Sequence, residues 1–102
     1  MGTQQPVIIL LVEDDPGHAL LIEKNLRRAG ISNEIAVLDT GQKAVDYLFK
    51  EGAYKEAPHA LPPLILLDLN LPVLDGYQVL KRIKNDERTR KIPVIVLTTT
   101  DN

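Results

Sequence analysis

Polar side chains that could bind a metal or attack a substrate stand directly after the apolar runs of this 102-residue sequence. Three acids follow the first run, an aspartate and an asparagine follow a later one, and a threonine follows the last: Glu13, Asp14, Asp15, Asp68, Asn70 and Thr98. Carboxylates held a few ångströms apart repel one another unless a cation or a proton relieves the repulsion. If the fold brings these acids together, they form a site for a cation.

The residue types favour one ion and one kind of chemistry. Oxygen ligands without cysteine suit a hard ion, and Mg²⁺ is expected because it binds through one or two carboxylates and keeps several waters. A metal at such a site screens the charge of an incoming phosphoryl group and lets a carboxylate act as the nucleophile. Asp68 is the predicted nucleophile, and the Thr98 hydroxyl is predicted to bind a phosphoryl oxygen.

Short apolar runs alternate with segments that carry helix signals. Strands are expected at residues 7–12, 34–38, 64–67 and 94–97. All but the weaker second run are apolar on both faces, as parallel strands covered by helices require. Alternation of strands and helices predicts an α/β fold with a doubly wound parallel sheet and right-handed crossovers. Ligands of such sheets bind beyond the carboxyl ends of the strands, which is where the acids stand.

Start signals precede each of the three intervening helices. Asp15-Pro16 supplies a cap and a proline at the first helical position, and this helix is expected to end at Gly30. Thr40 is expected to cap the second helix, and the third is expected to begin near Asp75-Gly76. Asp15 is therefore predicted to serve mainly as a helix cap.

Composition excludes several classes of protein. With 44% hydrophobic and 25% charged residues and a formal charge of −2, the chain is expected to form one soluble globular domain. The lack of cysteine excludes disulfides and zinc–sulfur sites. No apolar stretch approaches the ~20 residues of a membrane span, so no membrane partner is expected. A mildly acidic balance with four aromatic residues gives no reason to expect nucleic acid.

Three segments resemble the receiver domains of two-component response regulators, the CheY-like family: residues 10–16, residues 66–72 with Asp75-Gly76, and residues 92–98. They occur in the family's order and at its spacing. The resemblance implies one receiver domain over residues 7–102, after a tail of residues 1–6, with the flavodoxin-like strand order 2-1-3-4-(5). The long connection 52–63 and the ending 97–100 more narrowly resemble the stand-alone regulators paired with bacterial phytochromes and related histidine kinases.

The resemblance also implies a role for each site residue. Asp68 would accept the phosphoryl group from a sensor histidine kinase, and Thr98 would be the switch hydroxyl that moves toward it. Asp14 would bind Mg²⁺ directly, Glu13 mostly through a metal-bound water, and Asn70 through its backbone carbonyl. The implied protein is a cytoplasmic signalling component that acts through protein contacts, and it is not a turnover enzyme.

The chain departs from the family at its C-terminus. Receiver domains carry a phosphoryl-binding lysine at the end of a fifth strand and an aromatic switch residue on that strand, and neither position exists in these 102 residues. The final strand and helix are therefore expected to be missing from this chain. The strand edge left exposed would allow pairing with a second copy, so a homodimer is one expected state.

Two other functions stay open. A receiver fragment or pseudo-receiver could keep the fold and the acids, bind metal without phosphotransfer, and serve only as a binding module. A Mg²⁺-dependent phosphatase with an aspartyl-phosphate intermediate would place a second acid two residues after the nucleophile. Asn70 occupies that position, which argues against rapid turnover of phosphate esters.

Overall fold

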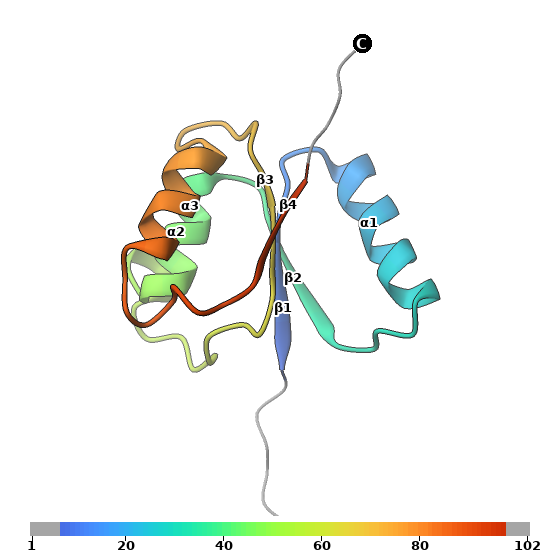
Figure 1. Ribbon diagram of the computed structural model, residues 1–102, viewed down its shortest axis with the longest axis horizontal. Helices are drawn as coiled ribbons and strands as arrows, with labels where there is room; N and C mark the ends of the chain where they lie inside the picture. Colours follow the sequence, from blue (N-terminus) through green and yellow to red (C-terminus); the bar gives the residue numbers. More distant parts are fainter. Residues whose placement is uncertain (1–6, 98–102) are drawn as a thin grey trace, which may run out of the picture.

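Four parallel strands form the central sheet of the computed structural model, which describes residues 7–97 (Figure 1). They lie in the order β2-β1-β3-β4, and their bounds are Ile8–Val12 for β1, Glu34–Leu38 for β2, Ile65–Asp68 for β3 and Val94–Leu97 for β4. The predicted doubly wound α/β fold and its strand order are confirmed. Each predicted strand agrees with the observed one to within a residue at either end.

Helices cover both faces of the sheet, as the wholly apolar strands require. Helix α1 (Pro16–Arg28) lies on one face, and α2 (Gly41–Phe49) and α3 (Gly76–Lys84) lie together on the other (Figure 1). Within residues 7–97 strand β4 forms one edge of the sheet, and its Ile95 side chain is half exposed. Both edge strands, β2 and β4, are therefore less covered than the two central strands.

The predicted caps Asp15 and Thr40 are confirmed, and Asp75 caps the third helix at its predicted start. The side chains of Asp15, Thr40 and Asp75 each accept a hydrogen bond from a backbone N–H in the first turn that follows, at 2.9, 3.0 and 2.9 Å. These bonds satisfy amides that have no partner inside the helix, and each contributes about 1 kcal/mol. Each helix therefore begins at a fixed residue just beyond the carboxyl end of a strand.

Alternate strand residues enter two separate cores. Ile9, Leu11 and Leu66 pack with Ala19 beneath α1. The larger core lies beneath α2 and α3 and includes Leu10, Val12, Ile65, Leu67, Val79 and Ile83. Burial of each large aliphatic side chain stabilises the fold by about 1.5–3 kcal/mol before the entropy cost is counted. Because β1 and β3 contribute to both cores, their register is fixed at the edge where the acids stand.

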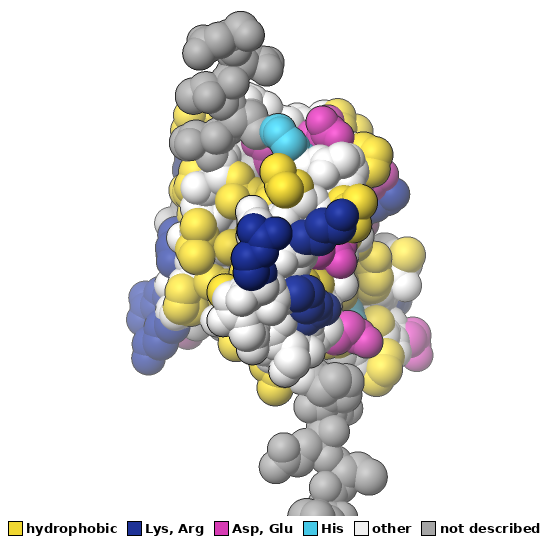
Figure 2. All heavy atoms as spheres, turned by 90° about the vertical axis from the view of Figure 1, so that its right-hand side faces the viewer, with side chains coloured by type: hydrophobic (Ala, Val, Ile, Leu, Met, Phe, Trp, Pro, Cys, Tyr) yellow, Lys and Arg dark blue, Asp and Glu magenta, His cyan; other side chains and the backbone are white. Residues whose placement is uncertain are grey.

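The outer face of α1 mixes apolar and basic side chains (Figure 2). Leu20 and Leu21 are each more than half exposed, and Arg27 and Arg28 lie in the last turn, where a positive charge interacts favourably with the helix dipole. Among the helices of residues 7–97, none is long and apolar enough to cross a membrane.

The long connection between α2 and β3 lies at the amino ends of the strands, away from the acids (Figure 1). It begins with a short 3₁₀ turn, η1 (Gly52–Tyr54). The His59 ring stacks on Tyr47 of α2 at 3.8 Å, and Lys50 donates hydrogen bonds to the carbonyls of Ala57 and His59. The connection is thus held against the C-terminal end of α2 at Ala57 and His59.

Candidate metal-binding site

The acids meet at the point in the sheet where the strand order reverses. Strand β1 lies between β2 and β3, and the crossover helices α1 and α2 lie on opposite faces. Val12 at the end of β1 is paired with Leu67 of β3, so the next residues, Glu13 and Asp68, stand side by side. A crevice at such a switch point is where open α/β sheets bind their ligands.

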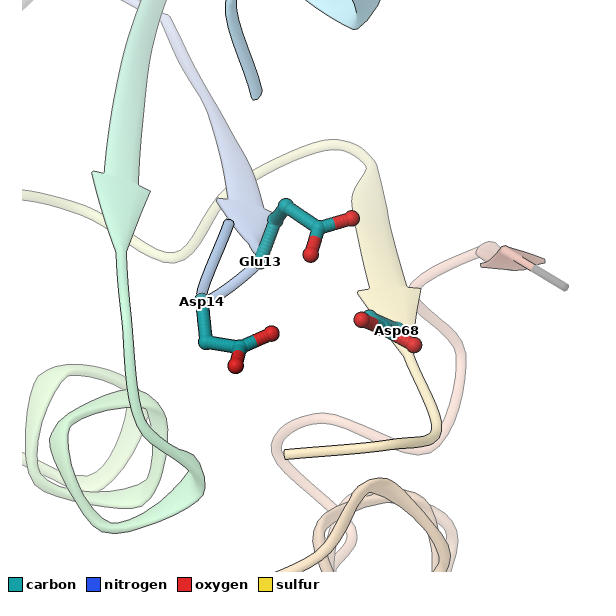
Figure 3. Close-up of side chains that lie close together, drawn as sticks. All are labelled: Glu13, Asp14 and Asp68. Atoms are coloured by element: carbon teal, nitrogen blue, oxygen red, sulfur yellow. The ribbon is translucent and has the colours of Figure 1, made fainter. Parts of the chain in front are cut away.

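Three carboxylates converge on one small volume at this edge (Figure 3). One oxygen from each of Glu13, Asp14 and Asp68 lies within 4.8 Å of the other two. Glu13 and Asp68 are each 2% exposed, whereas Asp14 is open to solvent. Two of the carboxylates are shielded from water and the third is accessible, so an ion can enter from the side of Asp14.

Backbone hydrogen bonds fix the two buried acids. The amide of Asn70 donates to Asp68 Oδ1 at 2.9 Å, and the amide of Asp15 donates to Glu13 Oε2 at 3.2 Å. The Glu13 amide in turn donates to the Leu38 carbonyl of β2 at 2.9 Å. The other Glu13 oxygen, Oε1, is buried without a hydrogen-bond partner among the described residues. A buried oxygen left in this state favours a cation or a proton.

Burial of Glu13 has an electrostatic consequence. The pKa of its carboxyl group is raised from 4.5 to about 7, chiefly because burial removes water from the charged form. The Asp15 amide and the His18 ring oppose this shift, while the neighbouring Asp68 carboxyl group adds to it. The ring nitrogen Nδ1 of His18 lies 3.6 Å from Glu13 Oε1. A metal ion at this place would supply the positive charge that the acids lack.

We expect the metal-free protein to lose stability as the pH rises between about 4.5 and 7. The folded state keeps the carboxyl proton of Glu13 to a higher pH than the unfolded chain does. The resulting stabilisation is therefore complete below pH 4.5 and is lost as the pH rises to the folded-state pKa of about 7. A shift of this size corresponds to at most about 3 kcal/mol. Urea unfolding in a metal chelator, at about pH 5 and pH 7.5, measures the difference.

The control for this measurement is Glu13→Gln, which has no carboxyl group to titrate. It should flatten the stability profile across the same pH window. An equal loss of stability in both proteins would show that Glu13 is not its source.

The structure brings together three of the five predicted site residues, Glu13, Asp14 and Asp68. Asn70 reaches the site with its backbone N–H, which donates to Asp68, and the residue as a whole is exposed to solvent. Thr98 lies outside the described residues. Sequence reasoning did not identify the Leu38 carbonyl as a partner of Glu13, because a backbone acceptor leaves no mark on residue type.

Several known proteins are similar to this chain in sequence. The model of the response regulator receiver domain matches residues 9–102. "Probable methanogenesis regulatory protein FilR2" of Methanothrix harundinacea is 48% identical over 97% of the chain, and response regulator Rcp1 of Synechocystis is 43% identical over 95%. The chain spans only 62% and 65% of these two relatives.

Solved structures agree with the fold. The bacteriophytochrome response regulator AtBRR superposes with a TM-score of 0.87 at 39% identity, over 95% of this chain and 69% of that one. The phosphorylated cyanobacterial phytochrome response regulator RcpA gives 0.82 at 42% identity, over 96% and 69%. The Mn²⁺-bound form of Rcp1 gives 0.83 at 43% identity, over 95% and 68%. At these identities the likeness extends from fold to sequence.

Proposed function

The chain belongs to the family of response regulator receiver domains, and from that premise we propose that Asp68 accepts a phosphoryl group with the help of Mg²⁺. The observation that carries the proposal is the position of Asp68. It is a buried carboxylate at the end of β3, within reach of two further carboxylates at a sheet switch point. Receiver domains are signalling modules, so the modified domain acts as a signal and not as a turnover enzyme.

The transfer replaces one bond to phosphorus with another. A carboxylate oxygen of Asp68 attacks the phosphorus of a phosphohistidine on the donor kinase, and an O–P bond forms as the P–N bond breaks. The bonding electron pair leaves with the imidazole nitrogen, which takes up a proton. The backbone N–H of Asn70, whose nitrogen lies 2.9 Å from Asp68 Oδ1, keeps the carboxylate in one orientation for the attack.

The acids present fit a hard divalent ion. We assign Asp14 and Asp68 as direct ligands of Mg²⁺, Glu13 as a ligand through water, and Asn70 as a ligand through its backbone carbonyl. This division is supported by the solvated position of Asp14 and by the burial of Glu13 Oε1, which has no hydrogen-bond partner within residues 7–97. When bound, the ion would offset the negative charge shared by the carboxylates and the incoming phosphoryl group. The related protein Rcp1 has been solved with Mn²⁺, which supports a divalent ion here.

The partner we propose is a sensor histidine kinase, and a bacterial phytochrome is the candidate that the relatives favour. AtBRR and RcpA are described as phytochrome response regulators, and RcpA has been solved in a phosphorylated form. We also propose that the domain extends over residues 7–102, that it acts in the cytoplasm, and that Thr98 contacts the transferred group. The output then depends on a shift between two surface states of the domain.

The proposal is tested by incubating the protein with a small phosphodonor such as acetyl phosphate, with and without Mg²⁺. Intact-mass spectrometry should show one added phosphoryl group that depends on the metal. The added phosphoryl group should be removed by base or by hydroxylamine, because both cleave an acyl phosphate. Mg²⁺ binding without any adduct would instead favour a binding module that carries out no phosphotransfer.

A further inference from the structure

The segment that runs from the last residue of β2 to the first residue of α2 contacts both halves of the acidic site without supplying an acid to it. At its start, the Leu38 carbonyl accepts the hydrogen bond from the Glu13 amide. Three residues later, Gly41 lies against the loop that follows Asp68. A Cβ atom built on Gly41 would lie 1.7 Å from the Leu74 carbonyl oxygen and 2.7 Å from its carbon. No side chain fits there, so the backbone of α2 and that of the loop are in direct contact.

The loop that receives this contact is strained at Val73. This residue has a φ of 72°, a conformation that is unfavourable for a β-branched side chain. The Leu74 amide donates to the Pro72 carbonyl at 2.8 Å, which closes the rarer and more strained kind of γ-turn. The Val73 side chain is 81% exposed, so its own packing does not hold the turn. Contacts made by neighbouring residues must hold it instead.

Those neighbouring contacts are present on both sides of the turn. Leu71 is buried and Leu74 packs against the larger core. The Gly76 amide donates to the Leu69 carbonyl at 3.1 Å, and a Cβ atom on Gly76 would lie 2.3 Å from the Asp68 carbonyl oxygen. The loop is therefore anchored at Asp68 by one glycine and at Leu74 by the other, with Asn70 between them.

We propose that Gly41 is a positioning residue for the acidic site, acting through Leu74 and the strained turn at Val73. Because Gly41 has no side chain, the Leu74 carbonyl packs directly against it. This contact keeps the turn closed and holds the Asn70 backbone beside Asp68. Because Leu38 at the end of β2 accepts the hydrogen bond from the Glu13 amide, the segment from Leu38 to Gly41 contacts both sides of the site. This inference rests on the proposed Mg²⁺-assisted phosphoacceptor function.

Gly41→Ala is the direct test, measured as the Mg²⁺ dissociation constant by titration calorimetry on protein shown to be folded by circular dichroism. Pushing Leu74 away should weaken Mg²⁺ binding about 10-fold or more, the scale on which displaced outer partners of a metal site act. The matched control is Val45→Ala in the core-facing side of the same helix. It should lower the urea midpoint and leave the dissociation constant unchanged.

Val73→Gly provides a second test that does not depend on the folding of Gly41→Ala. Glycine adopts a positive φ without strain, so the urea midpoint should be unchanged or higher, while a looser loop should weaken Mg²⁺ binding. In the double variant, Gly41→Ala should have a smaller effect on the dissociation constant than it has alone, because both changes act through the same turn.

The outcomes separate this inference from the function on which it rests. Wild-type protein that neither binds Mg²⁺ nor takes up a phosphoryl group would overturn both. Wild-type protein that does both, together with folded Gly41→Ala and Val73→Gly variants of unchanged Mg²⁺ affinity, would overturn the positioning role alone. If Gly41→Ala does not fold, the affinity of Val73→Gly decides the result.

Discussion

Asp68→Asn should remove the phosphoryl adduct completely while leaving the domain folded. The amide has nearly the shape of the carboxylate and can accept the same hydrogen bond from the Asn70 amide, so the β3 end keeps its place. It is not a nucleophile toward phosphorus under these conditions. It also removes one of three charges that crowd within 4.8 Å, so metal-free protein should be no less stable than wild type. Intact-mass spectrometry after treatment with acetyl phosphate and Mg²⁺ measures the adduct.

Asp15→Asn is the matched control for this substitution. Asp15 lies close to the same acids in sequence, but its side chain caps α1, and asparagine caps helices about as well as aspartate. The variant should therefore take up a phosphoryl group as wild type does. An adduct that survives in Asp68→Asn would move the acceptor to another side chain, and peptide mapping would identify it.

The second large effect is expected in metal binding. Asp14→Asn removes the one solvent-exposed carboxylate of the cluster, so the ion loses both a ligand and the charge at its point of entry. Even outer partners of metal sites cost about 10- to 100-fold in affinity when changed, so a loss at the upper end of that range is expected for a direct ligand. Titration calorimetry with Mg²⁺ and with Mn²⁺ measures it.

Thermal unfolding provides an independent measure of the same affinity. A ligand that binds only the folded state raises its stability by RT ln(1 + [L]/Kd), so added Mg²⁺ should raise the melting temperature of wild type much more than that of Asp14→Asn. Asp39→Asn is the control. It removes a surface carboxylate that follows β2 and is paired with Lys43 at 2.8 Å outside the cluster. An equal response to Mg²⁺ in all three proteins would exclude Asp14 as a ligand.

Most of the fold follows from local patterns. Short β-branched runs that are apolar on both faces favour covered strands, and the cap residues Asp15, Thr40 and Asp75 mark where each helix begins. The meeting of the acids follows too, because carboxyl ends of parallel strands share one edge. These features depend on residue type and spacing, so one sequence is enough to predict them.

The features that the sequence did not predict are set by packing between distant segments. Glu13 and Asp14 are consecutive acids, yet one is buried and the other is exposed. Val73 is a residue type that opposes its observed φ, so a local prediction would give the wrong backbone there. Gly41 has the appearance of an ordinary glycine near a helix start until Leu74 is placed against it. Each depends on a contact that no short window of sequence contains.

The pairing of β1 with β3 sets the order in which the domain can assemble. β1 is made first but lies inside the sheet, and its second neighbour follows only after two helices and a long connection. This closure spans the longest loop of any strand pair described, and such pairings are slow because chain entropy is lost before contacts form. Asp68 ends β3 and Glu13 directly follows β1, so both acids lie at this long-range pairing. If the acids bind Mg²⁺ as proposed, the ion can therefore stabilise only molecules in which β1 and β3 are already paired.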